Sequence, residues 1–325
     1  CIDGVAIVPG AYMLALLAPA MSEVLGDVPY SVREVSFKRF LALHDAADSG
    51  TRLVVSPSED SGKSAWSARV ESGCSAVTVH ATMLVVSVGV SLPPRVVWPK
   101  LQSRFVKNGT QTPVGDAFYA SLARNDYSGG FRCLEALWRD DDAAVSSSLA
   151  RVVLPFRAPL TARDAVFQTC AGLDGATHAA IATLCLDVSS AILFQGLEQL
   201  EVFQPTQGLA QEVWAHVQEE QGKRVCIALC DGDGVLYAKL TGLRLQARGA
   251  VHSDLSSIVA VDNWSFRESS EIDGRMVVLA ACGSAAQLHA AATAHVVPPV
   301  RAPLMVSAQD PELSAYVRSV QMEDS

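Results

Sequence analysis

The sequence lacks the features of several large classes of protein. It has 25 Lys and Arg residues against 34 Asp and Glu, a net charge of −9, so it has no basic excess with which to displace counterions from nucleic-acid phosphate. Only 18% of its 325 residues are charged and 50% are hydrophobic, which excludes disorder as the dominant state. We therefore expect no nucleic-acid partner and a folded chain of about two domains.

Paired cysteines are absent as well. The eight cysteines are scattered along the chain, none lies in a Cys-x-x-Cys pair, and several fall within apolar runs. Buried free thiols of a reducing compartment explain this pattern better than a disulfide framework or a zinc site. The sequence therefore predicts a cytoplasmic protein without a metal site.

No uncharged apolar run reaches the roughly 18 residues of a membrane span. The most apolar segment, residues 2–20, contains Asp3, is interrupted by Pro9-Gly10 and has no basic residue before it. These features argue against a signal peptide. We predict no membrane association, and we expect a chain that opens on Cys1 in the middle of such a pattern to be a piece of a longer protein.

What the sequence does contain is one arrangement that occurs twice. A helix that is apolar nearly all round is expected first at 10–25 and again at 162–184. Strand-like runs follow the first helix at 32–43, 51–56, 65–71 and 76–86, and the second at 191–203, 211–218, 223–230 and 235–246. A helix without a polar face must be wrapped on every side, and a curved antiparallel sheet is an economical wrapper. We predict an α+β fold made of two such units.

The domain boundaries follow from this pattern and from changes in composition. The first unit is assigned to residues 1–92, the second to 117–248, and the Pro-rich, polar segment 93–116 between them to a linker. Residues 249–325 differ in pattern and read as a partial α/β structural subdomain. Its strand-to-helix turn at Ala281–Ser284 contains one Gly, whereas a dinucleotide-binding turn needs three.

Three groups of residues carry possible chemistry, and each has a plain structural alternative. The first is Gly4 with Pro9 and Gly10, where a Pro-Gly pair opens a buried helix. Backbone N–H groups at a helix start are unpaired and can hold an oxygen that gains negative charge in a transition state. An ordinary helix start is the alternative interpretation.

The second group is Asp164 and Gln168, whose spacing places a carboxyl and an amide on one face of the second helix. Beside an apolar pocket, such a carboxyl could act as a general acid with the amide orienting it. However, Thr161 precedes Asp164 by three residues, which also fits a capping box that serves only the helix end. The third group is a glycine turn between Tyr127 and Phe131, which could equally be a loop before the strand-like run 134–138.

In this order and spacing, the three groups resemble motifs of the dehydratase domain of modular type I polyketide synthases. Gly4, Pro9 and Gly10 match the family pattern H-x-x-x-G-x-x-x-x-P-G, and the glycine turn corresponds to Y-G-P-x-F. Asp164 and Gln168 match D-x-x-x-Q. The resemblance covers residues 1–247 and implies a double hotdog, in which two antiparallel sheets each wrap a long buried helix. The tail resembles the start of a structural reductase-like subdomain.

The resemblance also implies an activity. The domain would be a hydro-lyase that eliminates water from a β-hydroxyacyl thioester on an acyl carrier protein, leaving an α,β-enoyl thioester. A catalytic His would stand immediately before Cys1 as the base. Asp164 would be the acid, Gln168 its orienting partner, and Gly10 the donor to the thioester oxygen. Tyr127 would line the site or bond to the β-oxygen, and Gly4, Pro9 and Phe131 would contact substrate.

The partners are implied in the same way. A carrier protein would present the substrate on its phosphopantetheine arm, and neighbouring synthase domains and a second copy of the chain would be the other partners. No cofactor is expected. Ser128-Gly129 stands where the family usually has Gly-Pro, which leaves open a pyran-forming cyclase, a double-bond isomerase or a non-catalytic hotdog scaffold.

Overall fold

The computed structural model describes most of the chain up to residue 248 and three short strands beyond it. The described residues are 2, 7–26, 28–41, 51–58, 65–73, 77–89, 93–112, 114–122, 124–127, 129–140, 146–157, 160–204, 209–220 and 224–248, with the backbone of 265–268, 276–281 and 304–305.

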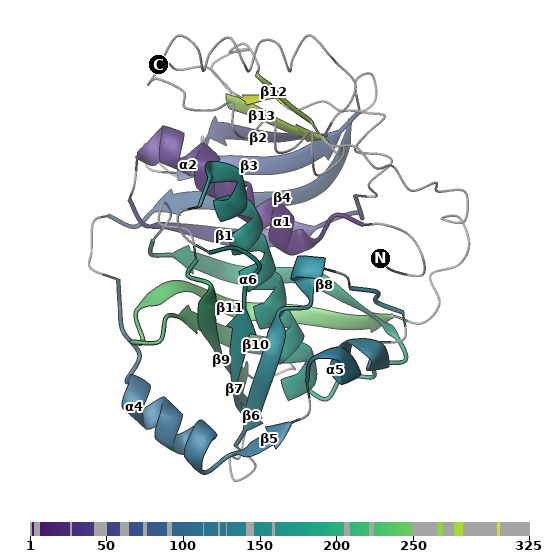
Figure 1. The fold of residues 1–325 in the computed structure, drawn as a ribbon. Helices are drawn as coiled ribbons and strands as arrows, with labels where there is room; N and C mark the ends of the chain where they lie inside the picture. The colour runs from purple at the N-terminus through teal and green to yellow at the C-terminus, as the bar shows by residue number, and fades with distance from the viewer. Residues whose placement is uncertain are drawn as a thin grey trace.

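The first unit consists of two short helices and four strands (Figure 1). Its elements are α1 (Gly10–Ala15), α2 (Leu17–Leu25), β1 (Tyr30–Phe37), β2 (Thr51–Pro57), β3 (Ala65–Ser72) and β4 (Thr78–Ser87). The single helix expected at 10–25 is therefore interrupted at Leu16. Pro19 explains the interruption, because its nitrogen cannot donate to the carbonyl of Ala15 and its ring collides with that carbonyl.

The second unit has one long helix, α6 (Ala162–Thr183), and six strands that form the wrapping sheet. The strands are β6 (Leu134–Arg139), β7 (Ser147–Val153), β8 (Ala191–Val202), β9 (Glu212–Glu220), β10 (Arg224–Cys230) and β11 (Leu236–Arg248). Residues 170–181 of α6 are all buried, so the prediction of a helix wrapped on every side is confirmed. Two shorter helical elements, α5 (Asp116–Ser121) and η2 (Gly129–Phe131), lie between the linker and β6.

The described strands of both units, together with β5 of the segment between them and three strands of the tail, join into one antiparallel sheet of 14 strands. Its order is β14-β12-β13-β2-β3-β4-β1-β8-β11-β10-β9-β7-β6-β5. The two units meet where β1 pairs with β8, with Tyr30 opposite Val202 and Ser36 opposite Gly196. Helices α1 and α6 pack against each other on the inner face, and the predicted α+β double-hotdog architecture is confirmed.

The segment expected to be a linker contains structure of its own. It forms α4 (Trp98–Leu101), a π-helical turn η1 (Gln102–Lys107) and β5 (Thr110–Thr112), which pairs with β6. Trp98 and Phe105 are buried in a small cluster with Trp214 of β9. Apolar side chains within a polar segment therefore attach it to the second unit.

The tail contributes three strands whose backbone is described. They are β12 (Ser265–Glu268), β13 (Met276–Ala281) and β14 (Leu304–Met305), and β13 pairs with β2 of the first unit. The helices expected at 284–294 and 311–320 lie outside the described residues.

Candidate active site

Asp164 caps its own helix. Its carboxylate Oδ2 accepts hydrogen bonds from the hydroxyl of Thr161 at 2.7 Å and from the Thr161 backbone N–H at 3.3 Å. The Asp164 backbone N–H in turn donates to the Thr161 hydroxyl at 3.2 Å, which completes a capping box. The structure therefore supports the capping interpretation that the sequence left open.

Gln168 is fully buried, but it does not orient Asp164. Its amide nitrogen donates to the carbonyls of Phe156 at 2.9 Å and Leu209 at 3.2 Å, and its amide oxygen accepts from the Phe156 N–H at 3.1 Å. These three bonds use the amide to hold two loops against the start of α6. The expected contact between Gln168 and Asp164 is replaced by backbone partners, because those loop groups are buried and need them.

A second pair with the same spacing lies further along α6. Asp174 and His178 follow Asp164 by three to four turns, and Asp174 is about 15 Å along the helix axis from Asp164 at the usual rise. Asp174 is 9% exposed and His178 is fully buried. The Asp174 Oδ2 and His178 Nε2 atoms are 3.3 Å apart.

These two atoms are poorly satisfied by the surrounding protein. Their contact lacks hydrogen-bond alignment, and within the described residues neither atom has another hydrogen-bond partner. Buried polar atoms are almost always hydrogen-bonded, so a buried carboxylate oxygen left in this state makes the pair a candidate for a functional site. Its neighbour on the helix, Gly175, leaves room here, because a Cβ at that position would lie 2.6 Å from the sulfur of Cys133.

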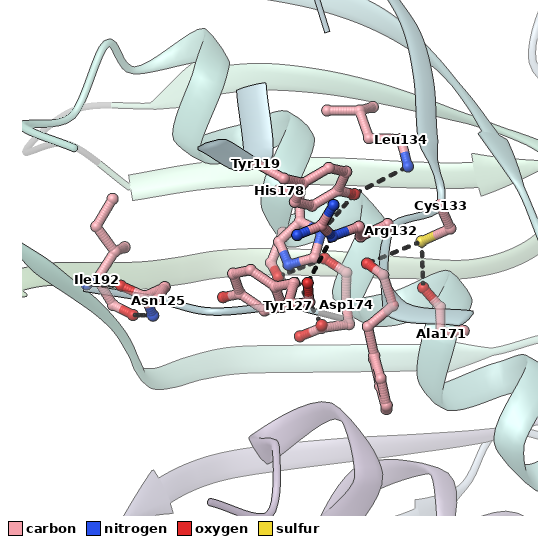
Figure 2. A network of polar contacts seen from close by, with 12 residues as sticks. Tyr119, Asn125, Tyr127, Arg132, Cys133, Leu134, Ala171, Asp174, His178 and Ile192 are labelled. Atoms are coloured by element: carbon pink, nitrogen blue, oxygen red, sulfur yellow. Dashed lines mark hydrogen bonds and ion pairs between the residues drawn. The ribbon is translucent and has the colours of Figure 1, made fainter. Parts of the chain in front are cut away.

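Aromatic side chains from the segment before β6 cover this pair. Figure 2 shows Tyr119, Tyr127 and Asp174 gathered around the imidazole of His178. The ring centroid of Tyr127 is 4.2 Å and that of Tyr119 5.4 Å from the centroid of the His178 ring. Arg132 donates from Nε to the carbonyl of Tyr127 at 2.6 Å and so fixes the backbone of the turn.

The phenol of Tyr127 stays protonated at neutral pH. Burial is the main reason that its pKa is raised, and the negative charge of Asp174 raises it further. The same two causes raise the pKa of the Cys133 thiol to about 12. The groups around Asp174 are thus neutral donors, and Tyr127 can donate a hydrogen bond to an oxygen placed beside it.

The glycine turn lies along α6 rather than over its start alone. At one end Tyr127 contacts His178, and at the other the ring of Phe131 packs edge-on against Phe167 at 5.2 Å. Tyr127 and Phe131 are therefore both brought to the face of α6 that carries Asp174. Ser128 lies outside the described residues.

The first group of predicted residues is described in part. Pro9 is the N-cap of α1, and Gly10 is its first residue. A Cβ on Gly10 would lie 3.0 Å from the ring of Phe37 and 3.1 Å from that of Phe194, so no side chain fits there without displacement. The Gly10 N–H is at a helix start and has no acceptor within the helix. Gly4 lies outside the described residues.

The beginning of the chain contacts the segment that carries Tyr127. Ile2 forms an isolated antiparallel bridge with Asn125. Asn125 is itself fixed, because its amide nitrogen donates to the Ile192 carbonyl at 3.0 Å and its oxygen accepts from the Ile192 N–H at 2.8 Å. Ile2 is thereby held beside the segment that carries Tyr127.

Two classes of feature are missing from the described part of the chain. No cluster of three or more His, Cys, Asp or Glu residues there is arranged to hold a metal ion. None of the helices described is long and apolar enough to cross a membrane.

The sequence interpretation missed Asp174 and His178, although a signal was present. Between residues 170 and 181 the helix is otherwise made of small and apolar residues apart from Thr177. Charged residues are almost never fully buried unless they are paired. A carboxylate and an imidazole four residues apart in an apolar helix therefore indicate two side chains that lie on one helix face and contact each other.

Comparison with known proteins adds a family and a fold. Residues 98–254 match the family described as the polyketide synthase dehydratase N-terminal domain. No curated protein matches the sequence.

Several solved structures are similar to the chain. The dehydratase domain from the CurF module of the curacin polyketide synthase has a TM-score of 0.64 and 19% identity over 76% of this chain and 87% of that one. The dehydratase domain of RzxB from Pseudomonas fluorescens has a TM-score of 0.61 and 20% identity over 75% and 87%. A trans-AT dehydratase domain from Brevibacillus brevis has a TM-score of 0.62 and 16% identity over 76% and 88%. At these identities the likeness establishes the double-hotdog fold.

Proposed function

Because residues 98–254 belong to the polyketide synthase dehydratase family, we propose that this domain dehydrates a β-hydroxyacyl thioester with Asp174 as its general acid. The observation that carries the assignment is the buried Oδ2 atom of Asp174, which is 3.3 Å from His178 Nε2 and has no hydrogen-bond partner in the described chain. The family match is to dehydratases and does not favour a cyclase, an isomerase or a non-catalytic scaffold.

The reaction needs one acid and one base. A base removes a proton from the carbon next to the thioester, and the electron pair forms the new carbon–carbon double bond as the β-hydroxyl leaves. Hydroxide is a poor leaving group, so the acid transfers its proton to that oxygen and water departs. Asp174 supplies this proton, and His178 faces the carboxylate that remains. The neutral phenol of Tyr127 donates a hydrogen bond to the departing oxygen.

The catalytic base is proposed to be a histidine just before Cys1. The bridge between Ile2 and Asn125 brings that part of the chain beside the segment with Tyr127. A histidine just before Cys1, as the family resemblance implies, would enter the site from this side, with a pKa suited to proton abstraction near neutral pH. This histidine stays a prediction.

Negative charge also develops on the thioester oxygen. The Gly10 N–H at the start of α1 is the donor proposed for it, since a fixed backbone donor lowers the energy of a transition state more than that of the substrate. Pro9 and Phe131 are proposed to contact the acyl chain. The rings of Phe37 and Phe194 next to Gly10 would limit the width of that chain.

The partners follow from the same proposal. A carrier protein would deliver the acyl chain on a phosphopantetheine arm, and neighbouring synthase domains would flank the dehydratase. The elimination itself transfers no electrons and requires no redox cofactor. The homodimer and the cytoplasmic location implied by the sequence stay predictions.

Two isosteric variants of the full chain test which acid acts. With a β-hydroxyacyl carrier protein as substrate and mass spectrometry to follow loss of water, Asp174→Asn is expected to lower turnover by about 10²- to 10⁴-fold. Asp164→Asn is the matched control and is expected to change turnover by less than about 2-fold, because a helix cap formed with Thr161 contributes to stability. Full activity of Asp174→Asn together with loss of activity in Asp164→Asn would return the role to Asp164.

A further inference from the structure

The segment 37–41, which begins with the last residue of β1, contacts the start of α1 at both of its ends. At one end, the ring of Phe37 would be 3.0 Å from a Cβ on Gly10. At the other end, the carbonyl of Leu41 accepts a hydrogen bond from the Val8 N–H at 2.8 Å. The path of this segment therefore determines where the backbone that leads into α1 lies.

Pro9 makes the position of Val8 important for Gly10. The pyrrolidine ring fixes the φ angle of Pro9, which is −60°, and leaves this residue without an N–H to donate. The Val8 N–H is therefore the last backbone donor before that of Gly10. Since it is bonded to Leu41 and a residue of fixed φ follows it, the direction of the Gly10 N–H depends on how Leu41 is held.

The side chain of His80, on β4, holds the middle of the segment 37–41. His80 is 2% exposed, and its Nδ1 atom is 3.0 Å from the carbonyl oxygen of Phe40. The backbone carbonyl of His80 also accepts a hydrogen bond from the Lys38 N–H at 2.7 Å. This backbone bond is open to any residue at position 80, whereas the bond to Phe40 needs a side-chain donor. The contribution of the imidazole can thus be separated from that of the β4 backbone.

Ser72, at the end of β3, holds the imidazole from its other side. The Ser72 hydroxyl oxygen is 2.7 Å from His80 Nε2. The Phe40 carbonyl can only accept, so Nδ1 carries a proton and donates it there. In the neutral ring, Nε2 then accepts a hydrogen bond from the Ser72 hydroxyl. Both ring nitrogens therefore have partners, which fix the orientation and the tautomer of the ring.

We infer that His80, oriented by Ser72, is a positioning residue for the dehydration, because it holds the segment 37–41 and thereby directs the Gly10 N–H towards the thioester oxygen. This inference rests on the proposed function through the role of Gly10 as the donor to that oxygen, and it is independent of which carboxyl is the acid. His80 touches neither the substrate nor the reacting atoms and acts through the backbone.

A fixed donor matters because negative charge develops on the thioester oxygen as the α-proton leaves. A donor that already points at this oxygen stabilises the charge without reorganisation. The carbonyl of the bound substrate carries much less of this charge, so a displaced donor weakens the transition state more than the substrate complex. Loss of the His80 side-chain bond should therefore lower kcat and leave KM nearly unchanged.

The tautomer of His80 can be measured without substrate. In the full chain labelled with ¹⁵N-histidine, proton–nitrogen correlations distinguish the Nδ1–H from the Nε2–H form, and His80→Asn identifies the signal. We expect the Nδ1–H form in the wild type. In Ser72→Ala the Nε2 resonance should shift, because its hydrogen-bond donor is lost. Ser148→Ala is the matched control, since it removes a buried hydroxyl bonded to Thr183 in the second unit, and it should leave the His80 signal unchanged.

Turnover separates the imidazole N–H from the bulk of the ring. His80→Asn keeps an N–H near the position of Nδ1, whereas His80→Leu fills the space without a donor. We expect kcat of His80→Leu to fall by about 10- to 100-fold with KM changed by less than about 2-fold, and kcat of His80→Asn to stay within about 3-fold of the wild type. A role in packing alone predicts the reverse order, since the smaller Asn leaves the larger gap.

The carbonyl of a bound thioester reports the donor directly. A saturated acyl-pantetheine thioester has no β-hydroxyl to lose, and with ¹³C at its carbonyl the C=O stretch can be isolated in infrared difference spectra. We expect a band at the lowered frequency of a hydrogen-bonded carbonyl in the wild type and in His80→Asn. In His80→Leu the band should move towards the frequency of an unbonded carbonyl.

The outcomes separate this inference from the proposed function. An Nε2–H tautomer in the wild type overturns the inference even if His80→Leu fails to fold. A folded His80→Leu variant with the wild-type carbonyl band and kcat overturns it as well, and so does a lower kcat in His80→Asn than in His80→Leu. A wild type that lowers the carbonyl frequency but does not dehydrate a β-hydroxyacyl thioester overturns the proposed function instead.

Discussion

The start and the middle of the same buried helix each carry an acid followed four residues later by a polar partner, and the surroundings of these two pairs differ. At the start of α6, Asp164 bonds to Thr161 and Gln168 bonds to two loop backbones. In the middle, Asp174 and His178 face each other beneath two tyrosine rings with polar atoms still unpaired. The second pair thus differs from the first in having buried polar atoms without hydrogen-bond partners in the described chain, and spacing alone does not reveal this difference.

The largest expected effect comes from replacing the buried amide of Gln168 by a carboxylate. In Gln168→Glu, a carboxylate replaces the amide nitrogen that donates to the Phe156 and Leu209 carbonyls. Three oxygens would then face one another in a buried place, and we expect a loss of about 3–5 kcal/mol of unfolding free energy at neutral pH.

Urea unfolding monitored by circular dichroism measures this loss. Gln168→Met serves as the control, because it removes the amide without adding charge and should cost less. The loss in Gln168→Glu should also shrink as the pH falls and the new carboxyl takes up a proton. A variant as stable as the wild type would show that the amide bonds contribute little and that Gln168 is free for another role.

A second histidine with a buried, unpartnered ring nitrogen tests whether such a nitrogen is by itself the mark of a site. His216 on β9 also has an unpartnered Nε2 within the described chain. Its neighbours are the ring of Phe105 and the guanidinium of Arg104, and burial, followed by the charge of Arg104, lowers its pKa to about 4. We therefore treat it as structural and expect its effect to be on stability.

The lowered pKa of His216 determines how its contribution to stability changes with pH. The folded-state pKa of His216 lies below the ordinary value of 6.5, so the unfolded chain binds the proton first. Its contribution to stability is complete above about pH 6.5 and is lost as the pH falls towards 4, by at most about 3 kcal/mol. Urea unfolding across this range should show the decline, and His216→Gln should weaken it without changing turnover at pH 7. An equally steep decline in the variant would assign it to other groups.

The smallest expected effect concerns the helix cap that Thr161 and Asp164 form at the start of α6. Thr161→Ala removes the hydroxyl that bonds to both the backbone and the side chain of Asp164, and we expect a loss of about 1 kcal/mol. Turnover should remain unchanged. Asp164→Ala should cost about the same, and the double variant should cost less than the sum because the two residues share their bonds. A fall in turnover with either single variant would show that the cap belongs to the reaction centre.

Much of the fold could be predicted from the sequence because it depends on local patterns. The helix at 162–184 and the strands that follow it were placed within a few residues by apolar periodicity and turn residues. The interruption at Leu16 was missed, although Pro19 was its visible cause. The packing of the segment 93–108 was missed because its apolar residues, such as Trp98 and Phe105, are spaced without a regular period.

The site was predicted in part. The glycine turn was recognised, and Tyr127 lies near the buried carboxyl of Asp174, whereas the catalytic roles predicted for Asp164 and Gln168 stay predictions. Which of the two acids on α6 becomes buried depends on where the segment from Tyr119 to Leu134 crosses the helix. Gly175 permits that close approach, since a Cβ there would meet both Cys133 and Val152. Such a contact joins residues that are far apart in sequence, and helical spacing carries no information about it.

The pairing of β1 with β8 has a consequence for how the two hotdogs could be separated. Since one hydrogen-bonded ladder runs through both of them, the peptide between residues 89 and 110 is a covalent tether rather than a hinge. A chain cleaved there would remain a single particle with its register preserved. The geometry that the two halves share therefore depends on this ladder more than on the covalent connection between them.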